Sequence, residues 1–178
     1  MQAHEILQQA GPGFAASILG FFRENERNVY KTTLATLAQG RNLRPVFIQQ
    51  KPAPAQIEWM GRELAHRRGD SMAEQVLQVW LMRARTPMLV KFVEALGIAH
   101  DGKGAVDDLP DSFEADRLQA AVDGLLAEFD AREVAVYLHV FQMQRPGGWP
   151  ELAAILAEDP RLALGHPEDG TPMAEGNS

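Results

Sequence analysis

The chain of 178 residues contains no cysteine, and this absence excludes several classes of site at once. Disulfide bonds, Cys-ligated zinc or iron–sulfur centres and thiol nucleophiles all need cysteine. The sequence also lacks a run of about 18 uncharged apolar residues, which a transmembrane helix would need. The longest candidate, residues 14–22, is shorter than that and is preceded by Glu5 instead of basic residues. These absences lead us to expect a cytoplasmic protein without a membrane span.

Motifs of the common hydrolytic enzymes are missing as well. No serine lies in a Gly-x-Ser-x-Gly turn, and no His-Glu-x-x-His sequence occurs. Both motifs place a nucleophile or a metal-activated water at a fixed geometry. We therefore identify no catalytic residue, expect no cofactor, and favour a non-catalytic function.

Charge is divided unevenly along the chain. Residues 23–91 carry 12 Lys and Arg against 6 Asp and Glu, whereas residues 92–178 carry 5 against 17. The net charge of −7 hides a basic half and an acidic half. Such a division indicates a charged partner, head-to-tail self-association, or two halves that attract each other within the fold. The sequence leaves all three open.

The spacing of apolar residues predicts an all-α protein. They recur three and four positions apart in segments of roughly 10 to 16 residues, which is typical of amphipathic helices. We expect a bundle of about seven or eight helices. Residues 134–141 are apolar on nearly every side and rich in β-branched residues, so a buried strand is an alternative there. No second strand candidate exists to pair with it, and we predict a helix.

Length and composition predict one domain over residues 1–165 and a flexible acidic tail over residues 166–178. A weak internal similarity is also present. Asp70 and Asp130, 60 positions apart, each begin an apolar segment that is followed by a proline and a further apolar segment. Two related helical-hairpin halves would produce this similarity, and so would coincidence among leucine-rich helices.

The leading functional prediction is a basic face that binds a protein. Trp59 lies at helical spacing from Glu63 and His66, away from the apolar stripe of its segment. An aromatic ring flanked by cations is typical of a docking surface for an acidic partner or a single-stranded nucleic acid. The partner that we expect is an acidic protein surface or a second copy of the chain in a homodimer. The alternative is that Trp59 packs against a neighbouring helix and the arginines form a solvated rim. The predicted partner-binding residues are Arg41, Arg44, Lys51, Trp59, Arg62, His66, Arg67 and Arg68.

Residues 97–111 support a competing prediction, a metal-dependent enzyme or divalent-ion binder. This segment concentrates one imidazole and four carboxylates, and oxygen ligands suit hard divalent cations. The candidate ligands are His100, Asp101, Asp107, Asp108 and Asp111. The same carboxylates also have local roles, since Asp111 and Ser112 can cap a following helix.

Nucleic-acid binding by the basic residues 23–91 is a further alternative. Lys and Arg would neutralise phosphates there, but the negative total charge disfavours it.

Overall fold

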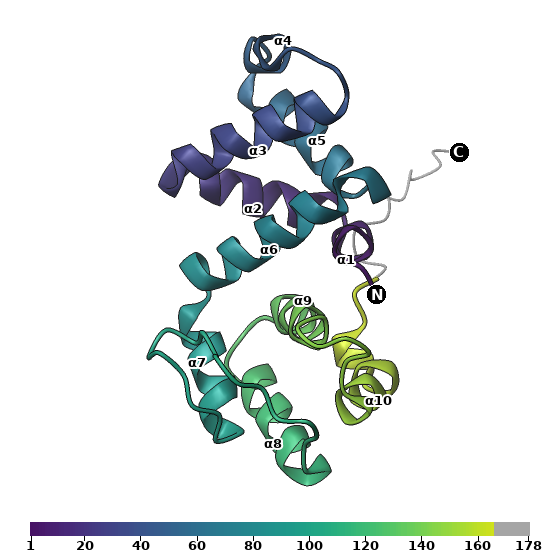
Figure 1. The fold of residues 1–178 in the computed structure, drawn as a ribbon. Helices are drawn as coiled ribbons and strands as arrows, with labels where there is room; N and C mark the ends of the chain where they lie inside the picture. Colours follow the sequence, from purple (N-terminus) through teal and green to yellow (C-terminus); the bar gives the residue numbers. More distant parts are fainter. Residues whose placement is uncertain (166–178) are drawn as a thin grey trace, which may run out of the picture.

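The computed structural model describes residues 1–165, so the predicted tail over residues 166–178 lies outside the described residues. Over this part the chain forms ten α-helices and two short 3-10 helices, and no strand (Figure 1). The prediction of an all-α fold is confirmed, and residues 134–141 lie within a helix. The longest of these helices has 15 residues, and none of them has the length and apolar character that crossing a membrane would require.

The α-helices are α1 (Ala3–Ala10), α2 (Pro12–Asn25), α3 (Arg27–Gly40), α4 (Pro45–Gln49), α5 (Ala53–Leu64), α6 (Asp70–Ala84), α7 (Thr86–Ala95), α8 (Ala115–Leu126), α9 (Ala131–Gln142) and α10 (Pro150–Glu158). The 3-10 helices are η1 (Arg67–Gly69) and η2 (Pro160–Leu162). Two helices, α1 and α4, were not expected. Helices this short are marginal on their own, so they form only where the rest of the fold holds them.

Proline sets the start of many of the helices. Five α-helices carry it in the first turn, where its missing N–H has no helical partner to lose; these are α2, α4, α5, α7 and α10. At α9 the start is instead fixed by Asp130, whose Oδ1 accepts a hydrogen bond from the Glu133 amide at 3.1 Å. Ser112 does not start a helix as expected, because α8 begins only at Ala115.

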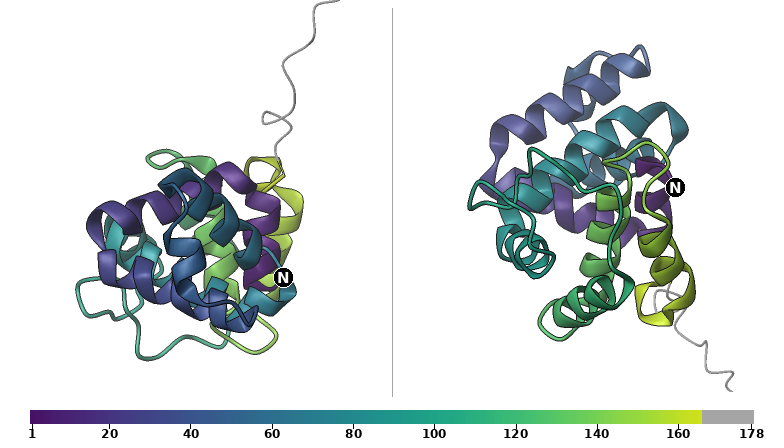
Figure 2. Two further views of the ribbon diagram at one scale, coloured as in Figure 1. Left: turned by 90° about the horizontal axis from the view of Figure 1, so that it is seen from above. Right: turned by 60° about the horizontal axis from the view of Figure 1, so that its bottom comes forward.

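The helices form two groups joined by α6 and α1. Helices α2 to α5 lie at one end of the molecule and α7 to α10 at the other, while α6 runs diagonally between them (Figures 1 and 2). Helix α1 packs against α2, α6 and α9, so it contacts both groups. One cluster of buried side chains extends through both, from Ala3 to Leu164.

The carboxylate of Asp70 holds α1 in place. Its Oδ1 accepts hydrogen bonds from the His4 backbone amide at 3.0 Å and from His4 Nδ1 at 2.7 Å. Burial acts to raise the pKa of Asp70, but the hydrogen bonds from His4 outweigh it and the pKa is lowered. Asp70 is itself the first residue of α6, so one carboxylate joins the starts of two helices that are 66 positions apart.

A charged pair connects the basic half to the acidic half. The guanidinium of Arg85, between α6 and α7, binds both carboxylate oxygens of Glu133 on α9, with Nε to Oε2 at 2.6 Å. It also lies over the ring of Trp80, 5.2 Å from the centroid. The hydrogen bond to Glu133 raises the pKa of Arg85. This ion pair holds the junction between α6 and α7 against α9.

An aromatic cluster anchors the long connection from α7 to α8. The ring of Trp149 is fully buried and stacks on Phe141, with centroids 5.1 Å apart, and Phe113 packs beside it at 5.3 Å. Trp149 Nε1 donates a hydrogen bond to the carbonyl oxygen of Pro110 at 2.8 Å. Residues 110–113 are therefore held to α9 and to the turn before α10.

Alanine substitutions at two glycines should change the free energy of unfolding in opposite directions. A Cβ on Gly69 would lie 2.3 Å from the backbone oxygen of Glu63, whereas a Cβ on Gly20, inside α2, would meet nothing within 4 Å. We expect Gly69→Ala to lower the free energy of unfolding by about 1 to 3 kcal/mol, because backbone must shift. Gly20→Ala should raise it by about 0.5 to 1 kcal/mol, because alanine is the better helix former. Urea unfolding of both variants measures this, and equal effects would contradict the close packing of η1 on α5.

Candidate functional site

The corner formed by α4 exposes three large apolar side chains. Leu43, Val46 and Phe47 are 39%, 44% and 58% exposed. Val46 and Phe47 are neighbours on α4, and Leu43 lies two residues before that helix, in the turn after α3. We call these three residues the apolar corner. Val46 and Phe47 lie on a helix only five residues long and Leu43 precedes it, which is why the periodicity of the sequence did not reveal this surface.

The apolar corner rests on an ordered support. Asn42 adopts a left-handed backbone with φ of 54°, and the Leu43 amide donates to the Ala38 carbonyl at 2.8 Å, which ends α3. Below the corner Ile48 is buried. Gln56 of α5 donates to the backbone oxygens of Gln49 at 3.0 Å and Lys51 at 2.8 Å. The exposure of the corner is thus imposed by a fixed backbone.

Cations surround the apolar corner. Arg41, Arg44 and Lys51, all predicted from the sequence, are exposed and lie immediately before, within and after this segment. Arg41 Nε lies 3.2 Å from Glu63 Oε2. Within residues 1–165 the side chains of Arg44 and Lys51 form no ion pair, so their charges are available to a partner. Three of the predicted residues therefore flank the exposed apolar residues along the chain.

The other five predicted residues lie along and beyond α5. Helix α5 has 12 residues and is about 18 Å long. It therefore separates Lys51, which precedes it, from Arg67, which follows it. Arg62 pairs loosely with Glu58 at 3.7 Å. Trp59 is partly buried against the core, as the packing alternative expected. The remaining residues, His66, Arg67 and Arg68, are exposed.

A groove also lies beside α5. This groove of about 920 Å³ runs between α5 and the helices α1 and α2. Alanine, glycine and proline form most of its walls, and Arg23, Glu58 and Arg62 supply its charges. Arg62 of the groove is paired with Glu58, whereas Arg44 and Lys51 beside the apolar corner form no ion pair within residues 1–165.

Acidic side chains gather at the opposite end of the molecule. Four exposed carboxylates of the connection after α7 and the start of α8 form no ion pair within residues 1–165; we call them the acidic surface, and they are Asp107, Asp108, Glu114 and Asp116. Helix α4 lies at one end of the molecule and α8 at the other (Figure 1). The cations Arg44 and Lys51, which flank α4, are therefore too far from the acidic surface to pair with it within one chain.

The structure does not gather the predicted metal ligands. Within residues 1–165 no group of three or more His, Asp or Glu side chains is placed to share an ion. Asp101 Oδ1 instead accepts hydrogen bonds from the amides of Lys103 at 2.8 Å and Ala105 at 3.0 Å, which lower its pKa. His100 accepts from the Gly102 amide, and Asp111 pairs with Arg145 at 3.1 Å. The cluster in the sequence becomes a series of separate local contacts.

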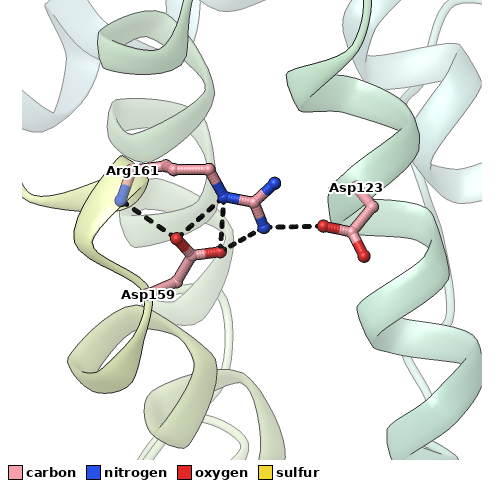
Figure 3. A network of polar contacts seen from close by, with 3 residues as sticks. All are labelled: Asp123, Asp159 and Arg161. Atoms are coloured by element: carbon pink, nitrogen blue, oxygen red, sulfur yellow. Dashed lines mark hydrogen bonds and ion pairs between the residues drawn. The ribbon is translucent and has the colours of Figure 1, made fainter.

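Further along the acidic half, one arginine satisfies two carboxylates. Arg161 of η2 donates to Asp159 Oδ2 at 2.6 Å and to Asp123 Oδ1 of α8 at 2.7 Å (Figure 3). The hydrogen bond from the Arg161 side chain lowers the pKa of Asp159. The ion pairs of Asp123 and Asp159 with Arg161 hold η2 against α8, so these two carboxylates are less available to a partner than those of the acidic surface.

No family model, curated protein or solved structure matches this chain.

Proposed function

We propose that this chain is a non-catalytic interaction module that self-associates, with the apolar corner of one copy docking on the acidic surface of another. The observation that carries the proposal is the exposure of Leu43, Val46 and Phe47 beside Arg44 and Lys51. Apolar side chains exposed together and rimmed by charge are typical of protein interfaces. Phe47, the most exposed of the three, is the expected anchor.

Charge complementarity favours a second copy as the partner. Arg44 and Lys51 are cationic and unpaired within residues 1–165, and the acidic surface carries unpaired carboxylates. Opposite charges steer two copies together and set their orientation, even where they add little affinity. Because the two surfaces lie at opposite ends (Figure 1), two antiparallel copies can satisfy both contacts in a closed dimer.

Replacing Phe47 with aspartate tests this interface. We expect Phe47→Asp to weaken self-association by about 30-fold, which corresponds to the loss of one anchoring side chain worth about 2 kcal/mol. Wild-type association should itself weaken as salt rises, because exposed charges are screened. Sedimentation velocity of both proteins at low and high salt measures both effects.

Met82→Asp is the matched control, since Met82 is another large apolar side chain, 46% exposed, that lies on α6 outside the apolar corner. It should associate as the wild type does. A wild-type monomer at every ionic strength would overturn the proposal. Retention of that monomer on a polyanion column at low salt would instead favour nucleic-acid binding by the basic half.

A further inference from the structure

A small cavity lies beneath the connection from α7 to α8. It has a volume of about 240 Å³ and is enclosed by α6, α7, α9 and residues 104–109. Most of its walls are apolar, formed by Leu81, Leu89, Val106, Leu109, Val140 and Phe141. The cavity is remote from the apolar corner, although the segment 104–109 that forms its outer wall also carries Asp107 and Asp108 of the acidic surface.

The hydroxyl of Tyr137 has no hydrogen-bond partner among the residues that the structure describes. Tyr137 is 4% exposed, lines the cavity, and packs edge to face on Phe92 with centroids 5.4 Å apart. Its hydroxyl forms no hydrogen bond within residues 1–165, although buried tyrosine hydroxyls usually find one. The only fully shielded polar side-chain atom without a partner in this part of the chain is Glu151 Oε2. The Tyr137 hydroxyl therefore keeps some accessible surface, and Tyr137 is one of the residues that line the cavity.

The walls select against charge. Among the described residues no Asp, Glu, Lys, Arg or His lines the cavity, and the other polar side chains there are Gln78 and Gln144. A charged ligand would lose its hydration without an ionic partner. Burial also raises the pKa of Tyr137, so its hydroxyl stays protonated and can donate a hydrogen bond at neutral pH.

The outer wall is held in position from both sides. Before the cavity, the Asp101 carboxylate fixes the turn up to Ala105. After it, the Pro110 carbonyl is bound by Trp149 Nε1 at 2.8 Å. Between these anchors Gly104, with φ of 87°, approaches α7 so closely that a Cβ would lie 2.6 Å from Leu89 Cβ. A wall held in this way loses little conformational freedom when a ligand binds.

We propose that this cavity is a binding site for a small, uncharged, mainly apolar molecule whose single hydrogen-bond acceptor is bound by the Tyr137 hydroxyl. A cavity of about 150 Å³ accommodates benzene, so the larger volume here suits one aromatic ring with a short substituent, roughly ten non-hydrogen atoms. The acceptor fixes the orientation of the ligand, and the apolar walls supply most of the affinity.

Two probes of nearly the same shape test the proposal. Acetophenone carries a carbonyl acceptor, and isopropylbenzene replaces that oxygen with a methyl group. Both should bind saturably to the full chain in an NMR titration, with shift changes at Val106, Leu109 and Val140. Tyr137→Phe should weaken acetophenone binding about fivefold, as expected for one neutral hydrogen bond. Isopropylbenzene binding should change less than twofold.

Tyr30→Phe is the matched control, because Tyr30 is also buried but its hydroxyl donates to Gln56 Oε1 at 3.0 Å. This variant should bind both probes as the wild type does. Leu109→Trp, which fills the cavity from its partly exposed wall, should abolish binding of both. The proposal is overturned if neither probe gives a saturable change, if the changes map to the groove along α5, or if Tyr137→Phe binds acetophenone unchanged.

Discussion

Replacing Trp149 with alanine is expected to lower the free energy of unfolding by about 3 to 5 kcal/mol, the usual cost of removing a large buried aromatic side chain. The indole is fully buried, stacks on Phe141 and contacts Phe113. Its removal leaves a cavity and also frees the Pro110 carbonyl from its hydrogen bond to Nε1. Urea unfolding followed by circular dichroism measures the change.

Trp149→Phe separates packing from hydrogen bonding. Phenylalanine keeps an aromatic ring against Phe141 but cannot donate to the Pro110 carbonyl, so this variant should lose only about 1 to 2 kcal/mol. It should also increase amide exchange in residues 104–111, because their anchor on Trp149 is gone. A Trp149→Ala variant as stable as the wild type would show that the connection after α7 does not depend on this indole.

Lowering the pH from 6.5 to 4 is expected to cost this protein about 3 kcal/mol of stability through His139 alone. Burial, assisted by the positive amino terminus, lowers the pKa of His139 from 6.5 to about 4. Between these values the unfolded chain binds a proton that the folded chain does not, so the free energy of unfolding falls as the pH falls. Well above 6.5 both states are neutral at this side chain, and well below 4 both are protonated, so its contribution to the slope vanishes there.

His139→Gln isolates this contribution from the carboxylates, which titrate over part of the same range. The difference in unfolding free energy between wild type and variant should change by about 3 kcal/mol between pH 6.5 and 4, and it should be constant above that range. Urea unfolding at several pH values gives the profile. Parallel loss of stability in the two proteins would contradict burial of a neutral imidazole on α9.

Some of the candidate surface could be predicted from the sequence. The cations Arg41, Arg44 and Lys51 stand out because the charge division makes residues 23–91 basic. Phe47 and its apolar neighbours do not stand out, because a helix of five residues is too short to show the helical spacing of apolar residues. Their exposure is also a tertiary property. It arises because Ile48 takes the buried position and Gln56 fixes the backbone from α5.

The segment 97–111 shows the opposite outcome. Its acidic residues and His100 form a conspicuous cluster in sequence, but nearness along a loop does not make side chains converge on one point. The backbone turns from Asp101 to Ala105 use the first carboxylate internally, and Asp111 is drawn to Arg145. The segment instead acts as a cavity wall. That role depends on apolar residues such as Val106 and Leu109, which meet α6 and α9 only in the folded chain.

The sequence by itself determined the all-α class, most helix positions and the charge division, because these depend on local spacing and composition. Only the tertiary structure decided how the charges are used. Some charged residues form ion pairs between the two halves, as Arg85 does with Glu133 and Lys91 with Glu128. Others, such as Arg44 and Asp108, remain exposed at opposite ends of the molecule. It also decided where α1 packs, since His4 of α1 is bound by Asp70 at the start of α6. Contacts between residues far apart in the chain depend on how helices pack, which no local pattern specifies.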